Sequence, residues 1–225
     1  MRRFVAAAAI ALLTVPLASA AAFAQGATRA GTYELSAGAI YTEASNYGFL
    51  SGASAKTDAA FGLGIQWAYN FNEHFAAGID GAFSGADYQG VVTPAAGNNN
   101  APFTYNGRLE TTTLRVSGIF NFSSSQFTPF VTAGFGMSWV DTNIPTGPSQ
   151  PVCWYYPYYG EICTDATPTK VTSNFSYNTG AGLRYDMRPD PYFIRLLYNV
   201  TWVDMGGAAG TIPYYQIRFD FGTKF

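Results

Sequence analysis

The sequence predicts an all-β fold, an eight-stranded antiparallel transmembrane β-barrel. Eight segments alternate between bulky apolar residues and small or polar ones, as strands do when their two faces meet different surroundings. The connections between these segments are short and long in turn. Charged residues make up only 12% of the chain and aromatic residues 17%. After residue 24, however, no segment approaches the ~20 consecutive apolar residues of a membrane helix. These observations favour strands that cross a bilayer.

Each of the eight segments is close to the ~9–11 residues that a tilted strand needs to cross a bilayer. They are 33–42, 59–71, 75–87, 109–122, 127–140, 174–187, 192–203 and 215–225. In 59–71, every second residue from Ala59 to Phe71 is apolar, and the positions between them hold only Ala, Gly, Gln and Asn. A face exposed to water would carry charge. We therefore expect the small residues inside a narrow barrel and the bulky ones in lipid.

The connections support the same architecture. Short ones fall at 72–74, 123–126 and 188–191, long ones at 43–58, 88–108 and 141–173, and one of intermediate length at 204–212. Tight periplasmic turns alternating with large outer loops are typical of outer-membrane barrels, and they would place both termini in the periplasm. The 141–173 loop contains five prolines. Because paired strands exclude proline, we expect no additional strands there.

The last segment ends on an aromatic residue. Tyr215, Ile217, Phe219, Phe221 and Phe225 share one face, and Gln216, Arg218, Asp220, Gly222 and Lys224 share the other. A closed barrel satisfies every backbone group in lipid, so this strand is expected to pair with the first one. Phe225 is then expected in a periplasmic aromatic girdle with Phe71, Phe75, Phe127, Tyr185 and Tyr192.

The N-terminal segment has the pattern of a secretory signal peptide. Arg2 and Arg3 precede an apolar run, and Ala22-Phe23-Ala24 supplies a small-x-small cleavage site. We expect residues 1–24 to be removed after Ala24 and residues 25–225 to form the barrel domain. The mature chain then has 10 basic and 14 acidic residues, a net charge of −4. A net negative charge of this kind gives no indication that the protein binds nucleic acid.

The mature chain resembles the small outer-membrane β-barrel proteins of Gram-negative bacteria, of the OmpA/OmpX type. The resemblance rests on the signal peptide, the YNFNEHFAAGIDGAF hairpin, the FTPFVTAGFGMSW strand and the terminal strand. It implies a location in the outer membrane, with membrane lipid and lipopolysaccharide as surroundings. It also implies that the barrel-assembly machinery reads the last strand, with Phe221 and Phe225 as the assembly signal.

Charged residues on the inner faces form the largest group of candidate functional residues. They are Glu34, Asp80, Arg115, Arg184, Asp186, Arg195, Arg218, Asp220 and Lys224. An eight-stranded barrel is only wide enough for side chains to fill, so these charges are expected to pair. A salt-bridge network that plugs the interior is the preferred interpretation, and a narrow porin-like channel for small solutes or apolar molecules is the alternative.

The longest loop contains both cysteines. Cys153 and Cys163 in an exported chain indicate a disulfide. The ring that they would close holds Trp154, Tyr155, Tyr156, Tyr158 and Tyr159. These aromatic residues either offer a contact surface for an extracellular ligand or collapse on one another over the barrel mouth.

His74 is the only histidine of the chain. It follows Phe71 in a predicted tight turn, which is a poor place for a Ser-His-acid site. A lipid-A-modifying enzyme is therefore the least favoured function, and neither a cofactor nor a metal is expected. The sequence favours a structural or surface-interacting, adhesin-like outer-membrane protein.

Overall fold

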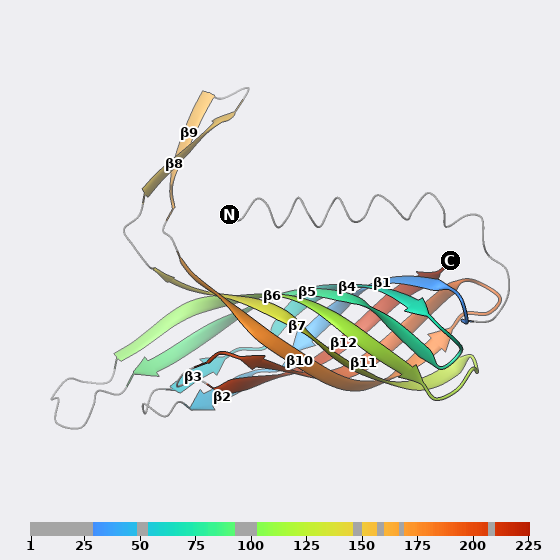
Figure 1. The fold of residues 1–225 in the computed structure, drawn as a ribbon. Helices are drawn as coiled ribbons and strands as arrows, with labels where there is room; N and C mark the ends of the chain where they lie inside the picture. Colours follow the sequence, from blue (N-terminus) through green and yellow to red (C-terminus); the bar gives the residue numbers. More distant parts are fainter. Residues whose placement is uncertain are drawn as a thin grey trace.

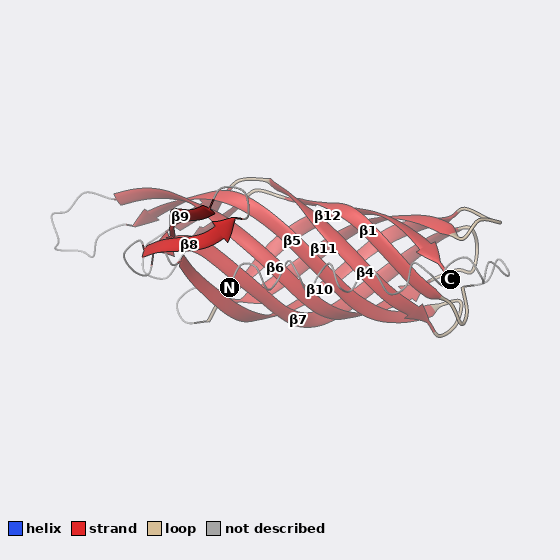
Figure 2. Ribbon diagram, turned by 90° about the horizontal axis from the view of Figure 1, so that it is seen from above, coloured by secondary structure: helices blue, strands red, loops and turns tan. Residues whose placement is uncertain are grey.

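Eight long antiparallel strands close into a barrel in the computed structural model (Figure 1). The structure describes residues 29–48, 54–92, 103–145, 150–156, 160–166, 169–206 and 210–225. Within these ranges the barrel strands are β1 (Tyr33–Thr42), β4 (Ala60–Asn70), β5 (Phe75–Val92), β6 (Phe103–Asn121), β7 (Phe127–Pro145), β10 (Thr169–Asp186), β11 (Tyr192–Asp204) and β12 (Thr211–Lys224). Each pairs with the next barrel strand along the chain, and all are inclined to the barrel axis (Figure 2). The predicted fold class is confirmed.

The last strand pairs with the first, as predicted. The β1–β12 register runs from Glu34 opposite Lys224 to Thr42 opposite Gln216. Beyond it, the backbone N–H of Tyr33 donates to the carbonyl of Phe225 at 2.8 Å, and the N–H of Phe225 donates to the carbonyl of Tyr33 at 2.9 Å. The chain is therefore hydrogen-bonded to its final residue.

The short connections 71–74, 122–126 and 187–191 lie at the same end of the barrel as the C-terminus, which we call the turn end (Figure 1). The aromatic residues predicted for a girdle belong to this end. The side chains of Phe71, Phe75, Phe127, Tyr185 and Tyr192 are exposed. The ring of Phe225 lies 6.1 Å from that of Tyr33.

Four strands continue past their predicted ends at the opposite, extended end. β5 runs to Val92, β6 begins at Phe103, β7 runs to Pro145 and β10 begins at Thr169. The β5–β6 register is unbroken from Phe75 opposite Phe120 to Val92 opposite Phe103. The predicted boundaries at 87, 109, 140 and 174 were wrong here. They followed the apolar alternation, whereas backbone pairing needs no apolar face and continues beyond it.

Two predicted loops contain further strands. β2 (Ser45–Gly48) and β3 (Ser54–Thr57) form a hairpin that pairs with β5. β8 (Gln150–Tyr156) and β9 (Gly160–Ala166) form a separate two-stranded sheet (Figure 1). The expectation of no strands in 141–173 was therefore wrong. Each strand of a two-stranded sheet has an unpaired edge, and such edges tolerate a proline such as Pro151.

The barrel exterior is apolar. Phe61 and Leu63 are 78% and 70% exposed. Alternate residues of the two strands that flank β1 are exposed in the same way: Phe61, Leu63, Ile65 and Trp67 of β4, and Tyr215, Ile217, Phe219 and Phe221 of β12. Among the described residues, no helix is long and apolar enough to cross a membrane. A continuous apolar band on a closed barrel suits contact with lipid.

Candidate functional site

The interior of the barrel holds ten buried charged side chains among the described residues, six basic and four acidic. Nine of them are the residues predicted from the sequence: Glu34, Asp80, Arg115, Arg184, Asp186, Arg195, Arg218, Asp220 and Lys224. None of the ten is more than 9% exposed. A buried charge without a partner destabilises a folded protein. The contacts among these ten side chains are therefore important for the stability of the barrel. They divide into two clusters along the barrel.

The turn-end cluster is centred on Asp186. Its carboxylate lies 2.7 Å from the guanidinium of Arg29, 2.9 Å from that of Arg184 and 3.2 Å from the ammonium of Lys224. Arg184 also holds Glu34 with both terminal nitrogens, at 2.7 and 2.9 Å. Asn70 donates to Glu34 at 2.9 Å. The cluster thus joins β1, β4, β10, β12 and the segment that precedes β1.

Arg29 was missed by the sequence analysis. It is fully buried, and its guanidinium donates to the carbonyls of Ser123 and Ser125 at 2.8 and 2.9 Å and to the hydroxyl of Thr128 at 2.7 Å. Its backbone N–H donates to Glu73 at 3.0 Å. Arg29 therefore ties the segment before β1 to two turns and to Asp186. Strand alternation could not have found it, because it lies outside any strand.

The central cluster is a chain of alternating charges. Arg115 contacts Asp80 at 2.7 Å, Asp80 also pairs with Arg218, and Arg218 contacts Asp220 at 2.7 Å. Asp220 lies 3.5 Å from Arg195. The chain begins and ends with an arginine, and it crosses the barrel from β6 through β5 and β12 to β11.

Phe193 separates the two clusters and was also missed. Its ring is fully buried, with the guanidinium carbon of Arg184 4.2 Å from the ring centroid and that of Arg195 5.0 Å from it. Arginines placed over the aromatic ring in this way are attracted to it. The sequence could have indicated its position. Phe193 is two residues from the inward-facing Arg195 in β11, so the two side chains share the inner face.

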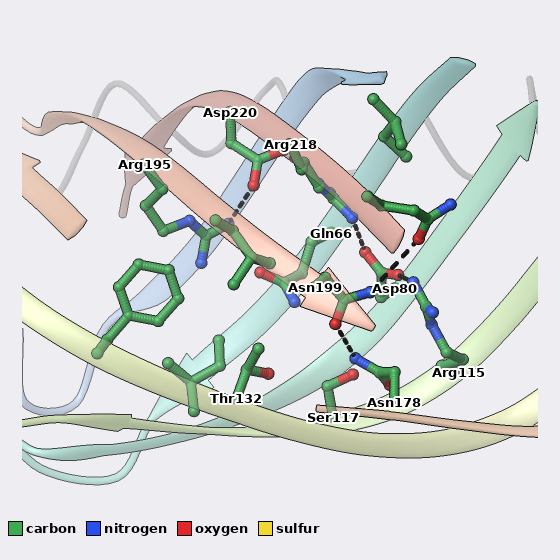
Figure 3. A pocket seen from close by; sticks show the side chains of 15 residues that line it. Gln66, Asp80, Arg115, Ser117, Thr132, Asn178, Arg195, Asn199, Arg218 and Asp220 are labelled. Carbon is green, nitrogen blue, oxygen red and sulfur yellow. Dashed lines mark hydrogen bonds and ion pairs between the residues drawn. The ribbon is translucent and has the colours of Figure 1, made fainter. Parts of the chain in front are cut away.

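Small residues make room for this network. A side-chain carbon at Gly64 would lie 2.8 Å from the guanidinium carbon of Arg218. The predicted small inner face of β4 is therefore what lets a long arginine lie across the barrel. Two cavities that the described inner side chains line have a volume of ≈ 20 Å³ each, and Figure 3 shows the one that the central cluster lines. Such a space is close to that of a single water molecule.

The other candidate residues lie away from this interior. His74 is in the turn after β4, with Nδ1 2.8 Å from the carbonyl oxygen of Asn121. Because a carbonyl only accepts, Nδ1 carries the proton. Cys153 and Cys163 are opposite one another in the β8–β9 hairpin and form the predicted disulfide. The backbones of Trp154, Tyr155 and Tyr156 belong to β8, but their side chains, like all of Tyr158 and Tyr159, lie outside the described residues.

A closed barrel with an apolar exterior and an ion-paired interior defines an integral outer-membrane β-barrel. The chain belongs to the family of the outer membrane protein beta-barrel domain, whose model matches residues 9–225. The resemblance seen in the sequence is thereby confirmed, and the family places the chain in the bacterial outer membrane, in contact with lipid. A comparison with curated protein sequences gives no match.

Solved structures with a similar chain path include an outer-membrane protein. OprG from Pseudomonas aeruginosa is 12% identical, with 88% of this chain and 97% of that chain covered and a TM-score of 0.52. Ail from Yersinia pestis, solved with the heparin analogue sucrose octasulfate, is 15% identical, with coverage of 87% and 99% and a TM-score of 0.47. Neisserial surface protein A is 15% identical, with coverage of 85% and 95% and a TM-score of 0.47. At these identities the likeness to OprG concerns the fold alone.

Proposed function

We propose that the protein is a non-enzymatic outer-membrane barrel with a plugged interior, and that its role is structural and surface-interacting. The observation that carries this proposal is the ion-paired interior. Two charge clusters cross the barrel one above the other, with Phe193 between them. Arg29 adds contacts to the turns that surround the turn end. Among the described residues, two interior cavities have a volume of only ≈ 20 Å³ each, about that of a water molecule, which counts against the channel alternative.

We expect the reconstituted wild-type protein to show no steady single-channel conductance in planar bilayers. The Glu34→Ser, Arg184→Ser variant shortens both partners of an interior ion pair and keeps the net charge of the protein unchanged. This variant should still show no steady conductance, because the central cluster continues to cross the barrel. Steady conductance steps in the wild type, at the same protein density, would support the narrow-channel function instead.

The extended end is the part that we propose to act on the cell surface. Three features project there: the long β5–β6 hairpin, the β2–β3 hairpin and the β8–β9 hairpin (Figure 1). Trp154, Tyr155, Tyr156, Tyr158 and Tyr159 belong to the last of these. Rigid aromatic side chains of this kind suit contact with a protein or a sugar. Lipopolysaccharide is the partner that we propose for the barrel wall itself.

The Cys153→Ser, Cys163→Ser variant is expected to assemble with near-normal yield. The disulfide joins two strands of a sheet that is separate from the barrel sheet, so its loss leaves barrel closure intact. The hairpin itself loses a crosslink worth about 3 kcal/mol in the chain-entropy model. External protease on whole cells should then cleave between about residues 145 and 170 faster than in the wild type. Failure of the variant to reach the outer membrane would contradict this separation.

His74 is assigned a structural role in the proposal. Its ring is held by the Asn121 carbonyl and stacks at 6.2 Å on Phe120 at the turn end. A catalytic imidazole would need a free nitrogen beside a nucleophile. Lipid A modification that disappears in a His74→Ala variant with normal assembly would revive the enzyme hypothesis.

Export and assembly complete the proposal. We assign residues 1–24 to a signal peptide cleaved after Ala24, which N-terminal sequencing of the membrane form would test. Phe221 and Phe225 are the proposed assembly signal, read by the barrel-assembly machinery. Phe221 lies on β12 and Phe225 directly follows it, and the pairing of this strand with β1 closes the barrel.

A further inference from the structure

The β8–β9 hairpin continues from the ends of β7 and β10 (Figure 1). The pairing of β7 with β6 ends where Asp141 lies opposite Glu110. The pairing of β10 with β11 ends where Ser176 lies opposite Val203. Past these pairs, the only partner that β7 and β10 have among the described strands is each other. We call the described residues of 142–170, which include the hairpin, the arm.

The register of the two strands shifts at the base of the arm. Val171 lies opposite Asp141, but the next pair is Thr169 opposite Pro145. Three residues of β7, 142–144, therefore face a single residue of β10. Such a bulge disrupts the hydrogen-bond ladder and bends the strand. Two strands without a third are also only marginally stable in water. Residues 142–144 can therefore serve as a hinge.

Tyr88 reaches this hinge from β5. Its hydroxyl donates to the backbone carbonyl of Thr142 at 3.0 Å. β6 lies between β5 and β7 in the barrel sheet, so the tyrosine side chain has to cross it. Gly107 is opposite Tyr88 in β6, and a side-chain carbon there would lie 2.6 Å from the Tyr88 ring. The glycine thus lets the ring cross β6 and contact the first residue of the hinge.

The Tyr88 side chain is held in place for this hydrogen bond. It is 9% exposed, and its ring lies edge-on to that of Tyr105 at 5.8 Å. Burial raises the pKa of the Tyr88 hydroxyl, so the group keeps its proton and remains a donor at neutral pH. A single hydrogen bond contributes little net free energy. It can therefore break and re-form while the barrel stays folded.

We propose that the arm swings about residues 142–144 and that Tyr88 is the latch that holds it against the β5–β6 hairpin. While the Tyr88–Thr142 hydrogen bond is formed, the β8–β9 hairpin keeps one direction relative to the barrel. When the bond breaks, the hairpin reorients as a unit, because its own ladder and its disulfide remain intact. The swing lets the hairpin meet surfaces at different angles. That use rests on the surface role proposed above, whereas the motion itself does not.

Residual dipolar couplings of the backbone amides test the motion without a ligand. They are measured on the whole protein in aligned detergent micelles. In the wild type, the couplings of the β8–β9 hairpin are expected to fit the alignment of the barrel strands. Tyr88→Phe keeps the ring and removes the donor, so its hairpin couplings should shrink while those of the barrel stay unchanged. Hairpin couplings of wild-type size in Tyr88→Phe would overturn the proposal.

Two further variants assign the effect to the latch. Gly107→Ala leaves Tyr88 in the chain, but its methyl group displaces the ring, so it should reduce the hairpin couplings as Tyr88→Phe does. Tyr198→Phe is the matched control, because it removes the hydroxyl of an exposed tyrosine on the exterior of β11. It should leave the hairpin couplings unchanged. An equal reduction in Tyr198→Phe and Tyr88→Phe would contradict the role of Tyr88.

External protease on whole cells gives a second measurement. Cleavage of a segment that opens transiently follows the population of its open form when opening and closing are fast. Loss of one hydrogen bond should therefore raise the rate of cleavage at residues 142–144 about two- to tenfold in Tyr88→Phe. An unchanged rate at these residues overturns the latch. Faster cleavage throughout the barrel overturns it as well, because Tyr88 would then stabilise the whole fold.

Discussion

Asp186→Asn is expected to destabilise the folded barrel by about 3–5 kcal/mol, the cost of breaking a buried ion pair from one side. Asp186 is fully buried and holds Arg29, Arg184 and Lys224 at 2.7 to 3.2 Å. The asparagine keeps the size of the side chain and removes its charge. Glu34 would then be the one carboxylate left in the cluster to face three cations.

The effect is measured as the urea midpoint in lipid vesicles, with heat-modified mobility on gels as a check of folding. Asp190→Asn is the matched control, because Asp190 is exposed in the turn that follows β10. Arg29→Gln combined with Asp186→Asn should cost less than the sum of the two single changes, since residues in one network are coupled. Equal stability of Asp186→Asn and Asp190→Asn would contradict the assignment of Asp186 as the centre of the cluster.

The sequence predicted the membrane-embedded part of this fold well and the extended end poorly, for one physical reason. Alternation between apolar and polar residues arises only where one strand face meets lipid. It therefore located the start of β5 at Phe75 and the start of β11 at Tyr192 correctly. Beyond the predicted ends at residues 87 and 109, the apolar alternation stops. The backbone pairing of β5 with β6 nevertheless continues to Val92 and Phe103.

The candidate site divides in the same way. Charged residues at inward parity, such as Asp80 and Arg218, could be identified because an ionic group in an otherwise apolar strand has only the interior to occupy. Their partners could not be identified, because the Asp80–Arg218 and Arg184–Glu34 contacts join strands that are not neighbours along the chain. Arg29 was not predicted for a further reason. It lies outside the alternating segments, and its position depends on the turn residues that it contacts.

Leu196→Arg is expected to destabilise the barrel by about 2–4 kcal/mol, the cost of an arginine at mid-bilayer depth on a lipid-facing surface. Leu196 is 49% exposed on the barrel exterior. Its cross-strand neighbours, Leu183 and Phe219, are exposed apolar residues too, so no acceptor is at hand for a guanidinium. Val171→Arg is the matched control, because Val171 is 58% exposed on β10 beyond the segment predicted to lie in lipid, opposite Asp141.

Near the bilayer edge the same change costs only about 0–1 kcal/mol, so Val171→Arg should unfold at close to the wild-type urea midpoint. Both variants replace an exposed aliphatic side chain with arginine on an outward-facing strand position, and they differ in depth and in the carboxylate of Asp141 opposite Val171. Both are to be refolded into vesicles of the same lipid, and tryptophan fluorescence would follow unfolding. If Val171→Arg cost as much as Leu196→Arg, the apolar band would reach beyond residue 174 of β10, and the extended end would begin farther from the barrel than the alternation indicates.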